Sequence, residues 1–376
     1  MTDPKAVKFI YQQGLRCLES GDLTAAVALF DDVIKLTPEN ADAWSCRGLA
    51  LGHLKRYEES VASFDRAGEL KPEDSRIWYN RGIALAEWGQ HEQAIASFDK
   101  VFEIDPNHYE AWDSRGNSLM VLGRNREALA SYDKSLEIKP DYYRALSNRG
   151  NVLTNLGRLQ AALKSYDKAL KVKPDNAEIW FNRGCLLMTS EKSEEAIASY
   201  KKALQIKPDH VGSWINQGII LSQLGKEKEG LMCFEKGLEF DPNETHGWNN
   251  RGLSLRRLGR LKEAIASYDK SLACMPDNYE AWDNRGYALV KMKRYREALE
   301  NFDKALEINP NHVNAIYNKG YCYAAQGNVT LAVNHIQEAI KLNRAKYLPM
   351  AKTDPDLDSL RKNKRFQALV GDSKAK

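Results

Sequence analysis

Hydrophobic and polar positions along the chain repeat with a fixed period, and each period holds two stretches with helical spacing. A large side chain precedes a glycine by four positions, a small residue follows that glycine by twelve, and a bulky one comes four further on. The glycines recur every 34 residues, at Gly14, Gly48, Gly82, Gly116, Gly150, Gly184, Gly218, Gly252, Gly286 and Gly320. Residues four apart share one face of a helix. Each period therefore predicts a pair of helices.

The apolar positions of each period suit two helices packed against each other. The large residues before glycine are Ile10, Trp44, Trp78, Trp112, Leu146, Trp180, Trp214, Trp248, Trp282 and Ile316. The small residues are Ala26, Ser60, Ala94, Ala128, Ala162, Ala196, Gly230, Ala264, Ala298 and Ala332. The bulky ones that follow them are Phe30, Phe64, Phe98, Tyr132, Tyr166, Tyr200, Phe234, Tyr268, Phe302 and Ile336. Small residues let two backbones approach, and large ones fill the groove between them.

Glycine and proline mark the expected helix ends. A second glycine, suited to a left-handed C-cap, often stands seven residues after the first, at Gly21, Gly89, Gly123, Gly157, Gly225, Gly259 and Gly327. Proline follows the first glycine by 24 residues, at Pro38, Pro72, Pro106, Pro140, Pro174, Pro208, Pro242, Pro276 and Pro310. A helix ends at or before the residue that precedes a proline. The punctuation thus predicts one helical hairpin per period.

These landmarks resemble the tetratricopeptide repeat (TPR) family, whose pattern is W-x2-L-G-x2-Y, then A-x3-F, then P. The resemblance implies an all-α fold, a right-handed α-solenoid superhelix of ten TPR helical hairpins with a C-terminal capping segment. We expect a leader over residues 1–6, the repeats over 7–346, and a capping helix with a basic tail over 347–376, where Asp354-Pro355 can begin a helix. Similar tails close related bacterial arrays, which hints at a bacterial source such as a cyanobacterium.

Arginine replaces the family's leucine before the glycine in seven repeats, at Arg47, Arg81, Arg115, Arg149, Arg183, Arg251 and Arg285. We favour an ion pair with the acid that recurs on the second helix, at Asp65, Asp99, Asp133, Asp167, Asp269 and Asp303. The alternative is a basic ligand-binding stripe.

Asparagine stands two residues before the glycine in seven repeats, at Asn80, Asn148, Asn182, Asn216, Asn250, Asn284 and Asn318. In TPR proteins the first helix of each hairpin lines the concave face, which implies that this position looks inward. The series resembles the peptide-holding asparagine ladder of the O-linked N-acetylglucosamine transferase superhelix and of co-chaperones. An asparagine amide offers one acceptor and two donors to a peptide unit. The alternative is a solvent-facing polar position copied by duplication.

Two neighbouring positions of each repeat should also face inward, one residue before the asparagine position and one residue after the glycine. They add five apolar candidates for partner contacts: Tyr79, Phe181, Ile215, Tyr317 and Tyr321. Aromatic anchors dominate many interfaces, but ordinary packing between adjacent first helices explains the same residues. No lysine occurs in these positions, so we expect no carboxylate clamp for the acidic tails of chaperones.

Composition and motif searches narrow the function further. The formal net charge of +4 over 376 residues argues against a nucleic-acid binder, and no apolar stretch is long enough for a membrane span. Phosphate-loop, metalloprotease and serine-hydrolase motifs do not occur, so we expect no catalytic site, metal or cofactor. The sequence predicts a cytoplasmic protein-interaction scaffold, an adaptor or assembly factor that binds extended or helical segments of partner proteins in its concave groove. A structural or self-associating scaffold, including a homo-oligomer, and an RNA-binding helical repeat stay as alternatives.

Overall fold

A computed structural model describes residues 4–371, and its regular elements there are all helices. The prediction of an all-α fold of consecutive helical hairpins is confirmed. Residues 1–3 of the predicted leader and 372–376 of the predicted basic tail lie outside the described part of the chain.

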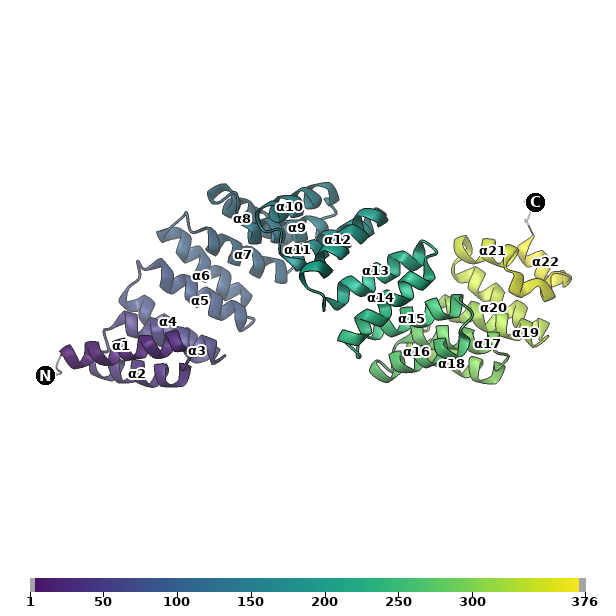
Figure 1. Cartoon of the computed structure of the whole chain (residues 1–376), viewed down its shortest axis with the longest axis horizontal. Coiled ribbons are helices and arrows are strands. Elements are labelled where there is room, and N and C mark those ends of the chain that lie inside the picture. The colour runs from purple at the N-terminus through teal and green to yellow at the C-terminus, as the bar shows by residue number, and fades with distance from the viewer. Residues whose placement is uncertain (1–3, 372–376) are drawn as a thin grey trace. The chain divides into compact units, whose positions relative to one another are not determined.

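Ten helical hairpins follow one another over the repeat region (Figure 1). Their first helices, called A helices here, are α1 (Pro4–Ser20), α3 (Ala41–His53), α5 (Ser75–Glu87), α7 (Tyr109–Val121), α9 (Tyr143–Asn155), α11 (Ala177–Thr189), α13 (Val211–Gln223), α15 (Thr245–Arg257), α17 (Tyr279–Lys291) and α19 (Val313–Ala325). Their second helices, the B helices, are α2 (Leu23–Leu36), α4 (Tyr57–Leu70), α6 (His91–Ile104), α8 (Asn125–Ile138), α10 (Leu159–Val172), α12 (Ser193–Ile206), α14 (Glu227–Phe240), α16 (Leu261–Cys274), α18 (Tyr295–Ile308) and α20 (Val329–Leu342).

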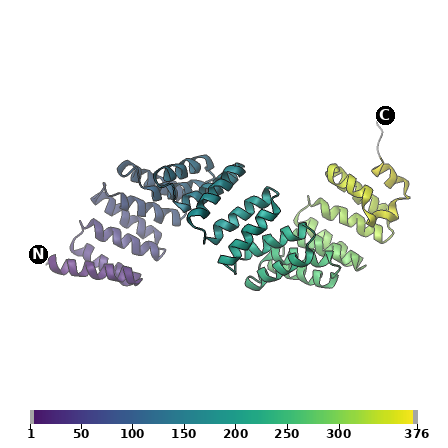
Figure 2. The ribbon, with the colours of Figure 1, turned by 45° about the horizontal axis from the view of Figure 1, so that its top comes forward.

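The chain divides into two compact units, Met1–Leu186 and Leu187–Lys376. Within each unit the hairpins are stacked in chain order, as the second view in Figure 2 also shows. Each hairpin covers the apolar face of the one before it, so the core of a unit extends along the stack. A core of this kind needs no large single domain.

The centre of nine hairpins is a close contact between the landmark glycine of the A helix and the bulky residue of the B helix. At Gly82 an added Cβ would lie 2.5 Å from the ring of Phe98, and at Gly252 the same distance from the ring of Tyr268. Both rings are fully buried. Glycine is needed at this position because the aromatic ring occupies the space that a side chain would take.

Two further features recur at the turns, a backbone conformation and a hydrogen bond. All seven glycines predicted as C-caps have a positive φ, between 71° and 84°, which an L-residue adopts only at a cost. Each of the seven tryptophans on A helices donates its indole N–H to the carbonyl of the proline six residues earlier, at 2.8 to 3.0 Å. The indole thereby ties the A helix to the loop that enters it.

The C-terminal segment closes the last hairpin with α21 (Arg344–Thr353), the 3-10 helix η1 (Pro355–Leu360) and α22 (Lys364–Val370). Asp354 caps η1 through the N–H of Asp356, with proline at the first helical position, as predicted. Leu357, Leu360 and Phe366 are fully buried against the last repeats. The segment thus covers apolar surface that a terminal hairpin would leave in water.

Candidate protein-binding surfaces

The seven predicted asparagines all lie on A helices and are partly buried, neither in the core nor fully exposed. Three donate an amide hydrogen to the A helix of the preceding hairpin. Asn148 reaches Asp113 at 3.1 Å, Asn284 reaches Asn249 at 3.2 Å and Asn318 reaches Asp283 at 2.8 Å. Each pair is 35 residues apart. These bonds fix the side chains and link neighbouring A helices.

The other asparagines are held differently. The amide of Asn216 donates to the hydroxyl of Tyr200 at 3.4 Å, and that of Asn250 to the backbone carbonyl of His246, one turn earlier in α15, at 2.9 Å. Asn80 lies on α5 and Asn182 on α11, both partly buried. The seven therefore share a repeat position and a partial burial, but they do not share one hydrogen-bond partner.

The five predicted apolar contacts separate into two groups. Tyr79 and Phe181 are partly buried, and the Tyr79 ring stacks on the His108 imidazole with centroids 4.7 Å apart. Ile215, Tyr317 and Tyr321 are buried. The Ile215 side chain packs against the backbones of Gly237 and Gly247, where an added Cβ would lie 2.9 Å from its Cδ1. Packing, the alternative explanation, accounts for Ile215.

Tyr317 is covered by the chain's own C-terminal segment, and Tyr321 belongs to the same buried cluster, beside the ring of Tyr287. The Tyr317 hydroxyl donates to Asp354 at 2.9 Å. Asp356, the second residue of η1, accepts a hydrogen bond from the hydroxyl of Tyr287 at 2.9 Å and another from the ammonium of Lys291 at 2.7 Å. Tyr317 and Tyr287 occupy A-helix positions that the sequence predicts to face inward, whereas Lys291 does not. The rings of Tyr317 and Tyr321 are therefore not open to a partner in this structure.

Asp113 is a buried acid on the A-helix side of the first unit. The residue is 5% exposed and lies on α7, and its carboxylate accepts a hydrogen bond from the amide of Asn148. Burial raises the pKa of Asp113 to about 6, and the hydrogen bond from Asn148 opposes that shift only in part. A partly protonated carboxyl at this point makes the surface around it sensitive to pH.

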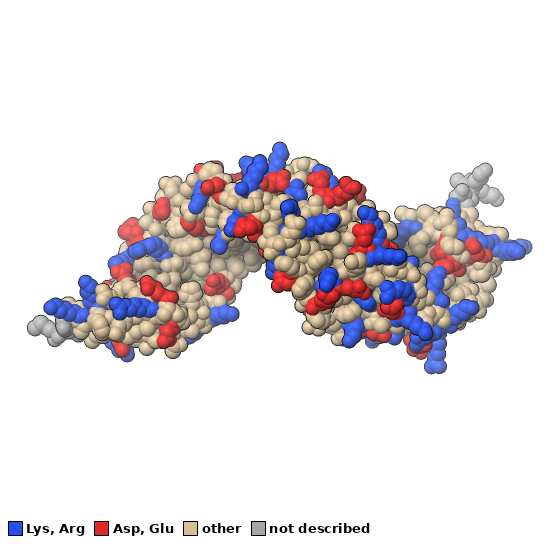
Figure 3. Space-filling model, viewed as in Figure 1, with Lys and Arg blue, Asp and Glu red and all other residues tan. Residues whose placement is uncertain are grey.

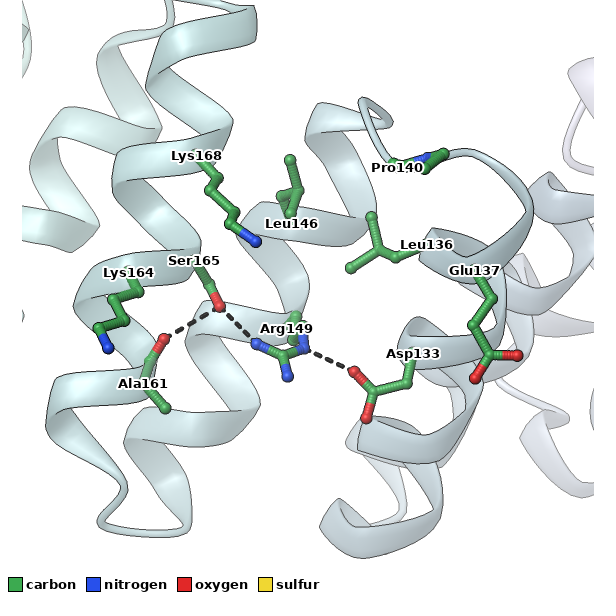
Figure 4. Close-up of a pocket in the computed structure, with 10 residues that line it drawn as sticks. All are labelled: Asp133, Leu136, Glu137, Pro140, Leu146, Arg149, Ala161, Lys164, Ser165 and Lys168. Atoms are coloured by element: carbon green, nitrogen blue, oxygen red, sulfur yellow. Dashed lines mark hydrogen bonds and ion pairs between the residues drawn. The ribbon is translucent and has the colours of Figure 1, made fainter.

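The repeated arginines lie on the opposite side of the A helices, between consecutive B helices. Arg149 donates from Nε to Asp133 on α8 at 2.6 Å and from a terminal nitrogen to Ser165 on α10 at 2.9 Å (Figure 4). The other six arginines pair with the equivalent acid of the preceding repeat, which is Glu235 in the case of Arg251. The favoured ion-pair interpretation is confirmed. Arginine suits the position because its planar fork can bridge two helices at once.

Charges of both signs alternate over the surface that Figure 3 shows, without a broad field of one sign. Between residues 4 and 371 no cluster of three or more histidine, cysteine, aspartate or glutamate side chains could hold a metal ion. Among the same residues, every helix is too short or too polar to cross a bilayer.

Sequence profiles of the tetratricopeptide repeat match the chain over most of its length. The matched ranges are 11–72, 75–108, 116–157, 150–190, 177–210, 211–244, 246–278, 279–312 and 301–334. The chain belongs to the tetratricopeptide repeat family. An uncharacterised protein of Methanocaldococcus jannaschii is 38% identical to this TPR chain over 56 residues. The matched stretch is 15% of this chain and 65% of the archaeal protein.

Solved TPR structures resemble the fold. A tetratricopeptide repeat protein of Parabacteroides merdae is 20% identical, with a TM-score of 0.53 over 70% of this chain and 97% of that one. PilF of Pseudomonas aeruginosa is also 20% identical, with a TM-score of 0.50 over 55% of this chain and 94% of that one. YrrB, a TPR protein with an unusual peptide-binding site, is 26% identical, with a TM-score of 0.44 over 50% of this chain and 97% of YrrB.

Sequence reasoning missed the groups that engage the C-terminal segment of this TPR protein. Tyr287 and Lys291 hold Asp356, although they lie 65 to 69 residues away in the chain. The periodic pattern could not reveal this contact because the segment after the repeats has no counterpart in them. The partners of Asn148, Asn284 and Asn318 also belong to positions where the residue type changes between repeats.

Proposed function

We propose that this TPR protein is a non-catalytic adaptor or assembly factor of the cytoplasm that binds extended segments of partner proteins along its A helices. The asparagines carry the proposal. Each of Asn148, Asn284 and Asn318 is fixed through its amide nitrogen, while its carbonyl oxygen accepts no hydrogen bond from another described residue. An amide held in this way can accept an N–H from the main chain of a partner without first losing side-chain entropy.

The protein's own C-terminal segment supports this use of the surface. Asp354 and Asp356 are bound through A-helix side chains, and Tyr317 and Tyr287 at those positions belong to the series expected to face inward. A stretch of chain outside the repeats is thus held on the A helices by side-chain donors.

Affinity capture from a native lysate tests the proposal. The bait is the full chain, compared with the triple variant Asn148→Ala, Asn284→Ala and Asn318→Ala, which removes the amides whose carbonyl oxygens would accept from the partner. We expect the wild type to retain a specific protein partner and the variant to lose most of it, because each removed amide takes away about 0.5–1.5 kcal/mol of net hydrogen bonding.

A matched control removes three amides from a different place. Asn107, Asn243 and Asn311 are exposed residues of the turns that follow Pro106, Pro242 and Pro310. The triple alanine variant of these residues should capture the same partner as the wild type. Equal capture by the two triple variants would contradict the proposal, and capture of RNA that disappears with salt would favour the RNA-binding alternative.

A further inference from the structure

The fifth hairpin departs from the repeat pattern at the position of the indole. Leu146 stands where the hairpins on either side have Trp112 and Trp180. In the preceding hairpin the Trp112 indole stacks on Phe102, with ring centroids 3.6 Å apart, and donates to the carbonyl of Pro106. Leu146 can do neither.

The two groups that an indole would contact are present but unused in the fifth hairpin. Leu136 holds the repeat position of Phe102, and Pro140 that of Pro106. Leu136 is only partly buried, and the carbonyl of Pro140 accepts no hydrogen bond from any residue that the structure describes. The apolar wall and the carbonyl that an indole would contact are therefore present, and the buried Leu146 lies at the base of this place.

A hollow of about 620 Å³ lies at this place, between α8, α9 and α10 (Figure 4). Leu136, Pro140 and Leu146 form its apolar part, and the Arg149 ion pair with Asp133 lies beside them. Equivalent hollows in two hairpins that have their tryptophan measure about 420 and 500 Å³. The hollow beside Leu146 is the largest of these three.

Two further departures make the rim of the same hollow basic. Lys164 occupies a position that is alanine in six other repeats: Ala28, Ala62, Ala96, Ala130, Ala198 and Ala266. Lys171 occupies the position at which other repeats place the acid that pairs with the lysine three residues earlier, as Glu103 does for Lys100 at 2.7 Å. Lys168 consequently has no such acid.

Lys164, Lys168 and Lys171 form no ion pair with a residue of the described chain, and Lys168 extends toward Leu146 and Arg149 (Figure 4). Glu137 on the opposite wall is already paired with Lys134 at 2.6 Å. An apolar hollow with uncompensated cations at its edge selects for an apolar group flanked by negative charge.

We propose that the hollow between α8, α9 and α10 is a second docking site, which takes an aromatic side chain of a partner protein flanked by aspartate or glutamate. The ring of a tryptophan or tyrosine packs on Leu136 and Pro140, above the buried Leu146, and its N–H or O–H donates to the carbonyl of Pro140. The flanking carboxylates pair with Lys164 and Lys168. This site lies on the B-helix side and is independent of the asparagines on the A helices.

The test measures fluorescence anisotropy of labelled peptides on the full chain. The probe is Gly-Asp-Trp-Glu-Gly, compared with Gly-Asp-Ala-Glu-Gly and Gly-Lys-Trp-Lys-Gly. We expect binding of the first peptide only, weakened by salt because part of the attraction is between charges. Saturation by the alanine or lysine peptide at the same concentrations, or no binding of the first peptide at millimolar concentration, overturns the proposal.

Two variants introduce residues that other repeats already carry at the equivalent positions, so we expect both variants to fold. Leu146→Trp lets an indole of the chain itself pack on Leu136 and donate to the carbonyl of Pro140, and should abolish binding while raising the melting temperature. The double variant Lys164→Ala and Lys171→Glu keeps the hollow open but removes the basic rim, and should weaken binding about tenfold, as loss of a favourable charge contact would. Lys304→Ala, at an equivalent lysine paired with Glu307, is the control and should bind as the wild type does. Unchanged affinity of Leu146→Trp would overturn the proposal.

Discussion

Inside the hairpins the same contact recurs with little variation, whereas the A-helix face changes from one repeat to the next. The landmark glycine meets a buried ring at eight described positions from Gly14 to Gly286, and an isoleucine at Gly320. On the A-helix face, by contrast, the amide of Asn148 meets an aspartate, and that of Asn284 an asparagine. The contact inside the hairpin recurs because only glycine leaves room for the bulky side chain that faces it from the B helix.

The difference shows where this protein can vary without losing its fold. A change at the hairpin centre has to be absorbed by close-packed neighbours. A change on the A-helix face alters hydrogen bonds and charge beside water. Positions of the second kind are those where a repeat protein can acquire a partner.

The largest effect is expected from breaking the repeated contact. Gly82→Ala places a Cβ 2.5 Å from the fully buried Phe98 ring. Overpacking a core lowers the free energy of unfolding by about 1–3 kcal/mol. The better helix propensity of alanine raises it by at most about 1 kcal/mol. We expect a net loss of about 2 kcal/mol in the free energy of unfolding, measured by urea denaturation.

Gly52→Ala is the matched control for that prediction. Gly52 also lies within an A helix, α3, but the nearest atom to an added Cβ is the Ser60 hydroxyl oxygen at 3.3 Å. This variant should be within about 0.5 kcal/mol of the wild type because the helix propensity gain offsets a small displacement. If both alanines destabilised the protein equally, the ring contact would not be the cause.

A smaller effect is expected from copying one variable position onto another. Asp113→Asn gives α7 the residue that Asn249 supplies to the equivalent bond in α15. The pKa of Asp113 is raised from its ordinary value of 3.8 to about 6, chiefly by burial. At about 1.4 kcal/mol per unit the shift gives an upper bound near 3 kcal/mol, and residual hydration reduces the expected gain at pH 7 to about 1–2 kcal/mol.

The pH dependence gives this prediction its sign. Because the folded pKa lies above the unfolded one, the cost of the Asp113 carboxylate is absent below about pH 4 and fully present above about pH 6. The wild type should therefore lose stability relative to Asp113→Asn as the pH rises through this window, and the two should agree at pH 4. A stability difference that did not change with pH would point to a packing effect instead.

The fold could be predicted from the sequence because the repeated residues act locally. Glycine, the aromatic residue, tryptophan and proline each contact a residue within the same 34-residue period. Ten repetitions of that evidence leave little ambiguity about the hairpin. The seven positive-φ glycines were predicted for the same reason, since a left-handed C-cap depends only on its own turn.

The candidate surfaces could be predicted only in part. The positions of the asparagines on A helices follow from the period, but the partner of each depends on the preceding hairpin. The C-terminal segment lies outside the periodic pattern, so the burial of Tyr317 beneath Asp354 could not be deduced. The hollow beside Leu146 lies where the repeat pattern is broken. The pattern shows that a tryptophan is replaced by leucine, but it does not give the shape of the surface that results.

The smallest expected effect comes from returning an exception to the repeated pattern. Lys293 has a φ of 60° at the position where seven other repeats have glycine. Its Cβ is strained there by about 1–2 kcal/mol, and glycine would remove that strain at an entropic cost of about 0.5–1 kcal/mol in the unfolded chain. Lys293→Gly should therefore raise the free energy of unfolding by about 0.5–1 kcal/mol. Lys293→Ala retains a Cβ and should give no gain, so an equal gain from both variants in urea denaturation would show that lysine charge, rather than backbone strain, limits stability at this turn.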